Sequence, residues 1–234
     1  YLFNQSVVMS TNHIVRSYDQ HIDEISNNLV NMASHAVKLL NLFNKAIINP
    51  KAEDWWQQAS TIDKNINQLD TNVEQRASEL LSLRQPMGSD FRLAISAIKM
   101  TVIYERIGDL AKNAVRRVQE NGYKLATDDL ESLQHMTEAV IDMVTLSGNA
   151  IKFADLAIVT NQHENDETVD KTYHNLMRSS IKNMQQPKID SEYYLQLILV
   201  IKNIERIGDY ANRIAKIAYY IHTGDRIYNH NLKN

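Results

Sequence analysis

Hydrophobic residues recur every three or four positions along most of this chain, which is the spacing of one face of an α-helix. In the first long stretch, Ile25, Leu29, Met32, Ala36 and Leu39 follow this spacing. The pattern predicts six long helices, over residues 11–48, 50–83, 91–120, 127–160, 164–185 and 191–223. Helices of this length occur mainly in bundles, so an all-α helical bundle is expected.

Short stretches of turn-forming residues separate these helices. Pro50 follows the first helix and also suits the first turn of the second. Ser89 or Asp90 is expected to cap the start of the third helix with a side-chain oxygen. The polar stretch at residues 161–163 is interpreted as the link between the fourth and fifth helices. Because the links are short, consecutive helices should run antiparallel.

The two halves of the chain repeat each other. The sequence Glu-Arg-Ile-Gly-Asp occurs at residues 105–109 and again at residues 205–209. Upstream of these copies, residues 63–67 and 166–170 also match, and both begin with Asp. Such a recurrence within two three-helix patterns indicates an internal duplication. The predicted fold is therefore all-α, with two tandem, sequence-related three-helix bundles.

The repeat also sets the expected domain boundaries. The first bundle is expected over residues 9–122 and the second over residues 123–226, with residues 227–234 as a C-terminal tail. Residues 1–8 are interpreted as an expression remnant or an unprocessed leader before a native start at Met9. They lack the charged region and the long apolar region of a secretory signal.

Composition narrows the class of protein. The 234 residues include 6 glycines and 3 prolines, which is too few turn residues for a many-stranded sheet. Since there is no cysteine, disulfides and thiolate metal sites are excluded. The net charge of −3 argues against nucleic-acid binding, and no apolar stretch is long enough to span a membrane. These features fit a cytoplasmic helical protein.

The repeated motif places acidic residues in pairs. Glu105 and Asp109 lie one helical turn apart, and Glu205 and Asp209 repeat the arrangement. Each pair is expected to point away from the apolar stripe of its helix. Like charges at this spacing cost about 0.2–0.5 kcal/mol in an isolated helix. We therefore expect both pairs to have a positive partner.

Glycine stands inside both motifs, at Gly108 and Gly208. A glycine in the middle of a helix costs about 1 kcal/mol relative to alanine. The usual reason to keep one is the close approach of another helix or of a ligand. We therefore expect a close approach at both positions.

One candidate for the positive partner is a metal ion. Further oxygen ligands are available on the second and fifth predicted helices: Asp63, Asn67, Asp70, Glu74, Asp166 and Asp170. Oxygen ligands select hard cations such as Mg²⁺, Mn²⁺ or Ca²⁺, or carboxylate-bound iron. The alternative is neutralisation by ordinary surface ion pairs with Arg106, Lys112, Arg206 and Arg213. Spacing alone leaves both interpretations open.

The segment at residues 83–92, followed by the two Glu-Arg-Ile-Gly-Asp motifs, resembles the PhoU family of phosphate-signalling regulators. The resemblance implies tandem three-helix bundles with metal clusters on their surface. The metal would be a divalent or trivalent ion, with Fe, Zn, Mn and Mg as candidates. The implied metal ligands are Glu105, Asp109, Glu205, Asp209, Asp166, Asp170, Asp63 and Asn67. Asn67 stands where the second repeat has Asp170, which weakens the charge of the first site.

The same resemblance implies a function. The protein would repress the phosphate-starvation response by linking the ATPase subunit of a phosphate ABC transporter to a sensor histidine kinase. It would reach the membrane only through these partners and would form a homodimer, without enzymatic activity. Two alternatives stay open: a metal-independent helical adaptor whose acidic faces dock partner proteins, and a carboxylate-bridged oxidoreductase or hydrolase.

Overall fold

The computed structural model describes residues 6–122, 125, 127–153, 156–186 and 190–227, and these form six α-helices without a β-strand. The helices are α1 (Ser6–Ile48), α2 (Trp55–Arg84), α3 (Gly88–Asn121), α4 (Thr127–Lys152), α5 (Leu156–Met184) and α6 (Ser191–Thr223). The all-α prediction is confirmed. Residues 1–5 and 228–234, which belong to the predicted leader and tail, lie outside the described residues.

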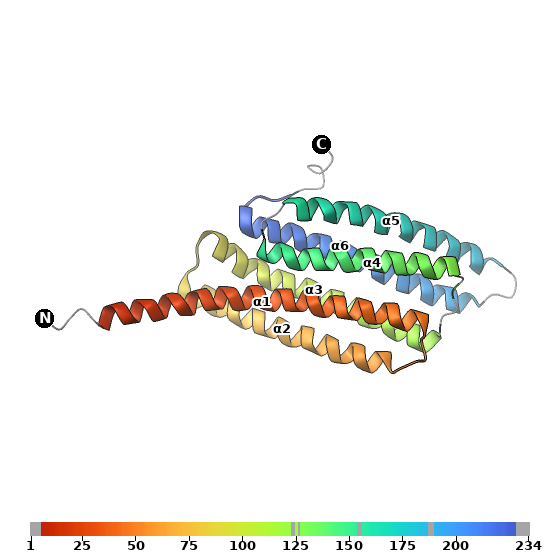
Figure 1. Cartoon of the computed structure of the whole chain (residues 1–234), viewed down its shortest axis with the longest axis horizontal. Coiled ribbons are helices and arrows are strands. Elements are labelled where there is room, and N and C mark those ends of the chain that lie inside the picture. Colours follow the sequence, from red (N-terminus) through yellow and green to blue (C-terminus); the bar gives the residue numbers. More distant parts are fainter. Residues whose placement is uncertain (1–5, 123–124, 126, 154–155, 187–189, 228–234) are drawn as a thin grey trace.

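The six helices form two side-by-side bundles. Helices α1, α2 and α3 pack on one another, and so do α4, α5 and α6. The bundles meet where α3 packs on α6 and α1 packs on α4, while α2 and α5 lie at opposite edges of the molecule (Figure 1). The tandem-bundle prediction is therefore confirmed, and the two repeated motifs, on α3 and α6, lie on helices that contact each other.

The interface between the bundles is part of one continuous hydrophobic core. Tyr104 on α3 is fully buried, and its hydroxyl lies 3.2 Å from Oγ of Ser147 on α4. A Cβ atom added at Gly148 would lie 2.9 Å from Cβ of Ala33, so α4 and α1 approach each other closely at this glycine. The shared core holds the two bundles together as one unit.

The link between α4 and α5 differs from the prediction. Helix α4 ends at Lys152 and α5 begins at Leu156, so residues 161–163 lie inside α5. Their polarity suggested a loop, but Gln162 is buried and its Nε2 donates a hydrogen bond to the carbonyl oxygen of Met143 at 2.7 Å. The polar residue belongs to a helix contact, which local sequence does not reveal.

Two predicted helix starts also differ. Helix α2 begins at Trp55 and is capped by Asp54, which accepts a hydrogen bond from the backbone of Gln57, so Pro50 lies in the preceding turn. Helix α3 begins at Gly88, and its N-cap residue Met87 has no side chain that can cap; Asp90 lies in the first turn and accepts a hydrogen bond from the hydroxyl of Tyr18 at 2.7 Å. In both cases the predicted residue lies close to the true boundary.

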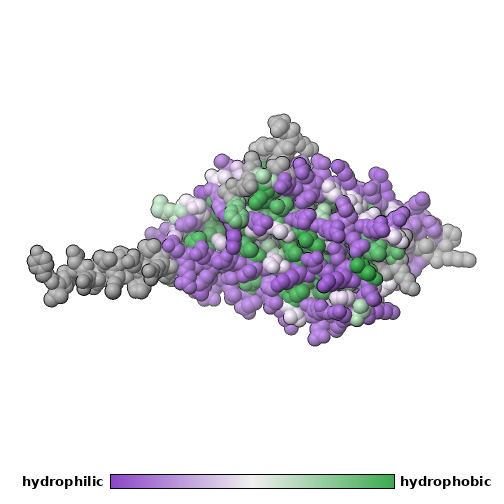
Figure 2. All heavy atoms as spheres, viewed as in Figure 1, coloured by the Kyte–Doolittle hydropathy of each residue, from purple (hydrophilic) through white to green (hydrophobic). Residues whose placement is uncertain are grey.

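The surface of the molecule carries both hydrophobic and hydrophilic side chains. In the view of Figure 2, hydrophobic residues reach the surface in small areas that hydrophilic side chains interrupt. No helix, over its described residues, has both the length and the apolar character needed to cross a bilayer.

Candidate functional site

The acidic residues of the first repeat gather where α2 packs on α3. Asp63 on α2 has only 5% of its surface exposed. A Cβ atom at Gly108 would lie 3.3 Å from Oδ1 of Asp63 and 3.0 Å from Cδ1 of Ile66. Gly108 thus allows α2 to approach α3 closely, as expected, and leaves room for the buried carboxylate.

A lysine occupies the centre of this first cluster. Nζ of Lys112 donates hydrogen bonds to Oδ2 of Asp63 at 2.5 Å and to Oδ1 of Asp109 at 3.0 Å. Burial lowers the pKa of Lys112, but the hydrogen bonds and charges of the two aspartates outweigh burial and raise it. Burial and the charge of Asp109 raise the pKa of Glu105. In the first repeat, the ion-pair interpretation is therefore confirmed for Lys112.

The second repeat has no lysine at the equivalent position. Asn212 stands there, and its Nδ2 donates a hydrogen bond to Oδ2 of Asp166 at 3.1 Å. Glu205 is largely enclosed, with 12% of its side chain exposed, and accepts a hydrogen bond from Nζ of Lys202 at 2.6 Å. Its second oxygen, Oε2, is buried without a hydrogen-bond partner. This enclosure differs from the solvated face that the helical spacing predicts.

Like charges accumulate in this second cluster, which we define as Asp166, Asp170, Glu205 and Asp209. Burial, followed by the charges of Glu205 and Asp166, raises the pKa of Asp209 from 3.8 to about 6. Burial and the charge of Asp170 raise the pKa of Asp166. A raised carboxylate pKa means that the negative form lacks compensation. At Asp209 and Asp166, burial and neighbouring carboxylates thus disfavour the negative form.

The donor chemistry suits a hard metal ion, but the side chains are not arranged as a finished metal site. In the part of the chain that the structure describes, no three His, Asp or Glu side chains are placed to hold a metal ion together. Asp170 and Asp209 lie at exposed positions. The buried, unpartnered Oε2 of Glu205 is the clearest free ligand atom of the cluster.

The remaining predicted residues differ in burial: Asp70 on α2 is half-buried, and its Oδ1 is enclosed without a hydrogen-bond partner. Asn67 is exposed on α2, and so is Glu74. Arg106, Arg206 and Arg213 are exposed and take part in none of the ion pairs between described residues. The surface ion-pair interpretation therefore does not hold for these three arginines.

Gly208 confirms the expected close approach, but with a different neighbour. A Cβ atom there would lie 3.3 Å from Sδ of Met143 on α4, whereas Gly108 faces α2. Lys202 and Asn212 were not among the predicted site residues. The spacing of Lys202, three residues before Glu205, could have suggested their contact. The repeat aligns Asn212 with Lys112, which could have revealed the missing charge.

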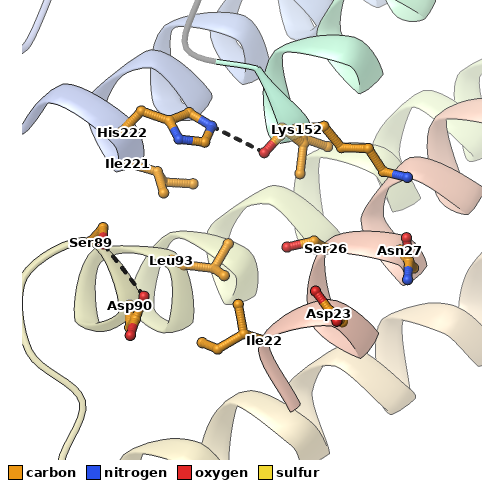
Figure 3. Close-up of a pocket in the computed structure, with 11 residues that line it drawn as sticks. Ile22, Asp23, Ser26, Asn27, Ser89, Asp90, Leu93, Lys152, Ile221 and His222 are labelled. Carbon is orange, nitrogen blue, oxygen red and sulfur yellow. Dashed lines mark hydrogen bonds between the residues drawn. The ribbon is translucent and has the colours of Figure 1, made fainter. Parts of the chain in front are cut away.

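A pocket of about 390 Å³ opens between the ends of the two bundles (Figure 3). Asp23 and Asp90 come from the first bundle, whereas Lys152 and His222 come from the second. Nε2 of His222 lies 3.1 Å from the carbonyl oxygen of Ile151. Because its opposite charges offset each other, this pocket has no clear preference for an ionic ligand.

The fold and the clusters together define a class of protein: two sequence-related three-helix bundles, each with one acidic cluster. The family model of the PhoU domain matches residues 14–118 and again residues 133–218. A Pseudomonas putida protein described as a phosphate-specific transport system accessory protein PhoU homolog is 30% identical over 226 residues, which cover 95% of this chain and 87% of that protein. A Zymomonas mobilis protein with the same description is also 30% identical, and the match covers 92% of this chain and 90% of the relative.

Solved structures agree with these matches. The crystal structure of PhoU from Pseudomonas aeruginosa has a TM-score of 0.81 and 28% sequence identity, over 89% of this chain and all of that one (100%). A phosphate transport system regulatory protein PhoU from Streptococcus pneumoniae shares the fold, with a TM-score of 0.78 at 22% identity, over 90% of this chain and 99% of the other. The chain belongs to the PhoU family.

Proposed function

We propose that the protein is an accessory regulator of a phosphate transport system and acts by contact with partner proteins. The Pseudomonas and Zymomonas relatives, which match it over nearly the whole chain, are described as accessory proteins of such a system. In this proposal a homodimer in the cytoplasm links the ATPase subunit of a phosphate ABC transporter to a sensor histidine kinase. It represses the phosphate-starvation response and catalyses no reaction.

The second acidic cluster is proposed to bind a divalent or trivalent metal ion. Its raised pKa at Asp209, caused by burial and neighbouring carboxylates, is the observation that carries this part of the proposal. Glu205 and Asp209 on α6 would hold the ion together with Asp166 and Asp170 on α5. All four supply oxygen ligands, which suit iron, Mn²⁺ or Mg²⁺, and Zn²⁺ with carboxylate ligands.

The ion would neutralise the cluster and cross-link α5 to α6. A partner protein would then meet a surface whose charge and stiffness differ between the metal-bound and the metal-free protein. A difference in affinity between the states is sufficient to shift a kinase or transporter between its own conformations. No bond in a substrate needs to be broken for this regulation.

A metal-independent adaptor is the second candidate. It is favoured by the absence of three converging metal-ligating side chains in the described ranges and by Lys112, which already supplies a cation to the first cluster. In this case the second cluster would dock directly onto basic residues of a partner. Its carboxylates would form ion pairs with these basic residues at the interface instead of binding a metal ion.

Metal analysis of the full chain separates the two candidates. The test compares the unmodified protein with a variant carrying Glu205→Gln and Asp209→Asn, and with a matched control carrying Glu105→Gln and Asp109→Asn. The metal proposal expects about one bound ion per chain, lost in the first variant and kept in the control. The adaptor expects no stoichiometric metal in any of the three. It also expects binding to the transporter ATPase subunit to weaken in the first variant, with or without a chelator.

A further inference from the structure

Basic side chains line a second groove, formed by α3, α6 and the segment after α6. The groove has a volume of about 250 Å³. Lys99 comes from α3, Arg213 and Lys216 come from α6, and Arg226 comes from the segment that follows α6. We call these four residues and the space between them the basic groove.

The charge of the basic groove contrasts with that of the whole chain, whose net charge is −3. Within the described residues, Lys99, Arg213 and Arg226 have no carboxylate at ion-pair distance. Burial lowers the pKa of Lys216, and the charge of the Asp166 carboxylate acts in the opposite direction. Three such cations gathered in a concave surface attract an anion.

The fold at the end of α6 builds this groove. Gly224 has a φ of 82°, and its backbone N–H donates a hydrogen bond to the carbonyl oxygen of Tyr220 at 2.9 Å. This left-handed cap reverses the chain, so that the guanidinium of Arg226 lies over the ring of Tyr220, 5.3 Å from its centre. Arg226 is thereby brought back to the groove and held against an aromatic ring.

Arg92 on α3 holds the C-terminal end of α6 in place. Its Nε donates a hydrogen bond to the carbonyl oxygen of Ile221 at 2.9 Å, and its guanidinium lies 6.0 Å from the ring centre of Tyr220. A Cβ atom at Gly224 would lie 3.6 Å from the guanidinium carbon of Arg92. The basic groove thus has a defined shape, because α3, α6 and the chain after α6 are tied together around it.

We propose that the basic groove binds a phosphate group, either as inorganic phosphate or as part of a small phosphomonoester. Guanidinium groups match the tetrahedral oxygens of phosphate with two parallel hydrogen bonds, and lysine adds a compact charge. The volume is small compared with pockets for drug-sized ligands, so a small anion fits best. Ile217, Ile227 and Tyr220 give one wall an apolar character that suits the organic part of an ester.

This proposal uses other residues than the metal site, although the charge of Asp166 acts on Lys216 of the basic groove. The basic groove lies between α3 and α6, whereas the second acidic cluster lies between α5 and α6. The binding test therefore uses the full chain after removal of metal, and its outcome is separate from that of the metal analysis.

Isothermal titration calorimetry tests the proposal with two probes, inorganic phosphate and phenyl phosphate. The test variant carries Lys99→Gln and Arg213→Gln, two exposed positions of the basic groove. The control variant carries Lys38→Gln and Lys64→Gln, which are exposed on α1 and α2 and change the net charge by the same amount. Circular dichroism confirms that both variants fold.

The expected result is saturable binding of at least one probe, weakened about tenfold or more in the test variant and unchanged in the control. Tighter binding of phenyl phosphate would assign the groove to phosphomonoesters, and tighter binding of inorganic phosphate would assign it to the free ion. No saturable binding of either probe would overturn the proposal. Equal weakening in both variants would also overturn it, since nonspecific attraction depends on net charge alone.

Discussion

At the scale of single residues, the two halves differ at the position of Lys112, besides the difference between Asn67 and Asp170. Lys112 places an ammonium between Asp63 and Asp109, whereas the equivalent Asn212 offers Asp166 an uncharged amide. The ammonium pairs with two carboxylates of the first cluster, whereas the amide adds no charge to the second. Two halves with the same five-residue motif therefore have different electrostatics.

Asp209 gives this imbalance a pH dependence. Its pKa of about 6 in the folded protein lies above the ordinary value of 3.8, so the native state binds the proton more tightly than the unfolded state. Stability should therefore decrease as the pH rises from about 4 to about 6, and remain lower above that range. Asp209→Asn removes the charge and should increase the free energy of unfolding of metal-free protein at pH 7. The gain should be about 1 kcal/mol or less, because water screens a half-exposed carboxylate.

Urea unfolding at several pH values measures this effect. The gain from Asp209→Asn should disappear below about pH 4, where the aspartate is protonated in both states. Asp225→Asn, an exposed substitution outside the cluster, is the control. A gain that is equal at pH 4 and pH 7 would contradict the electrostatic explanation.

At the scale of helices, glycines determine how closely neighbours pack. Gly148→Ala should destabilise the protein by about 1–3 kcal/mol, because its Cβ would lie 2.9 Å from Cβ of Ala33 and the two helices would have to separate. Gly208→Ala should be neutral or stabilising by up to about 1 kcal/mol, since the nearest atom is Sδ of the flexible Met143 side chain. Thermal unfolding of both variants measures this difference, and equal destabilisation would refute the packing argument.

The helices themselves could be predicted because their hydrophobic period is long and regular. The end of α4 was missed because Gln162 is polar yet buried in a contact with α4. The acidic pairs were found from spacing within one helix. The contact of Lys112 with Asp63 could not be found in this way, because it depends on how α2 packs on α3. Local patterns therefore identify ligand candidates, and helix packing determines their charge state.

At the scale of the whole molecule, the bundles should unfold together. Both tryptophans, Trp55 and Trp56, are in the first bundle, so their fluorescence reports on that half while circular dichroism reports on all helices. Because the bundles share one core, the two signals should give the same unfolding curve in urea. Tyr104→Phe should shift both curves together and reduce stability by about 1 kcal/mol, through loss of the contact with Ser147. Two separate transitions would show that the halves are independent.

Lys112 also affects how the molecule responds to its surroundings. A cation that is covalently part of the chain cannot be diluted, exchanged or chelated, so the first cluster keeps its charge pattern when the ion content of the cell changes. Under the proposed function, the second cluster, in which Lys202 pairs with Glu205 alone, would take the rest of its counter-charge from a bound ion. One half would then keep a constant charge while the charge of the other changes with the ions around it. A partner that contacts both halves could compare the two.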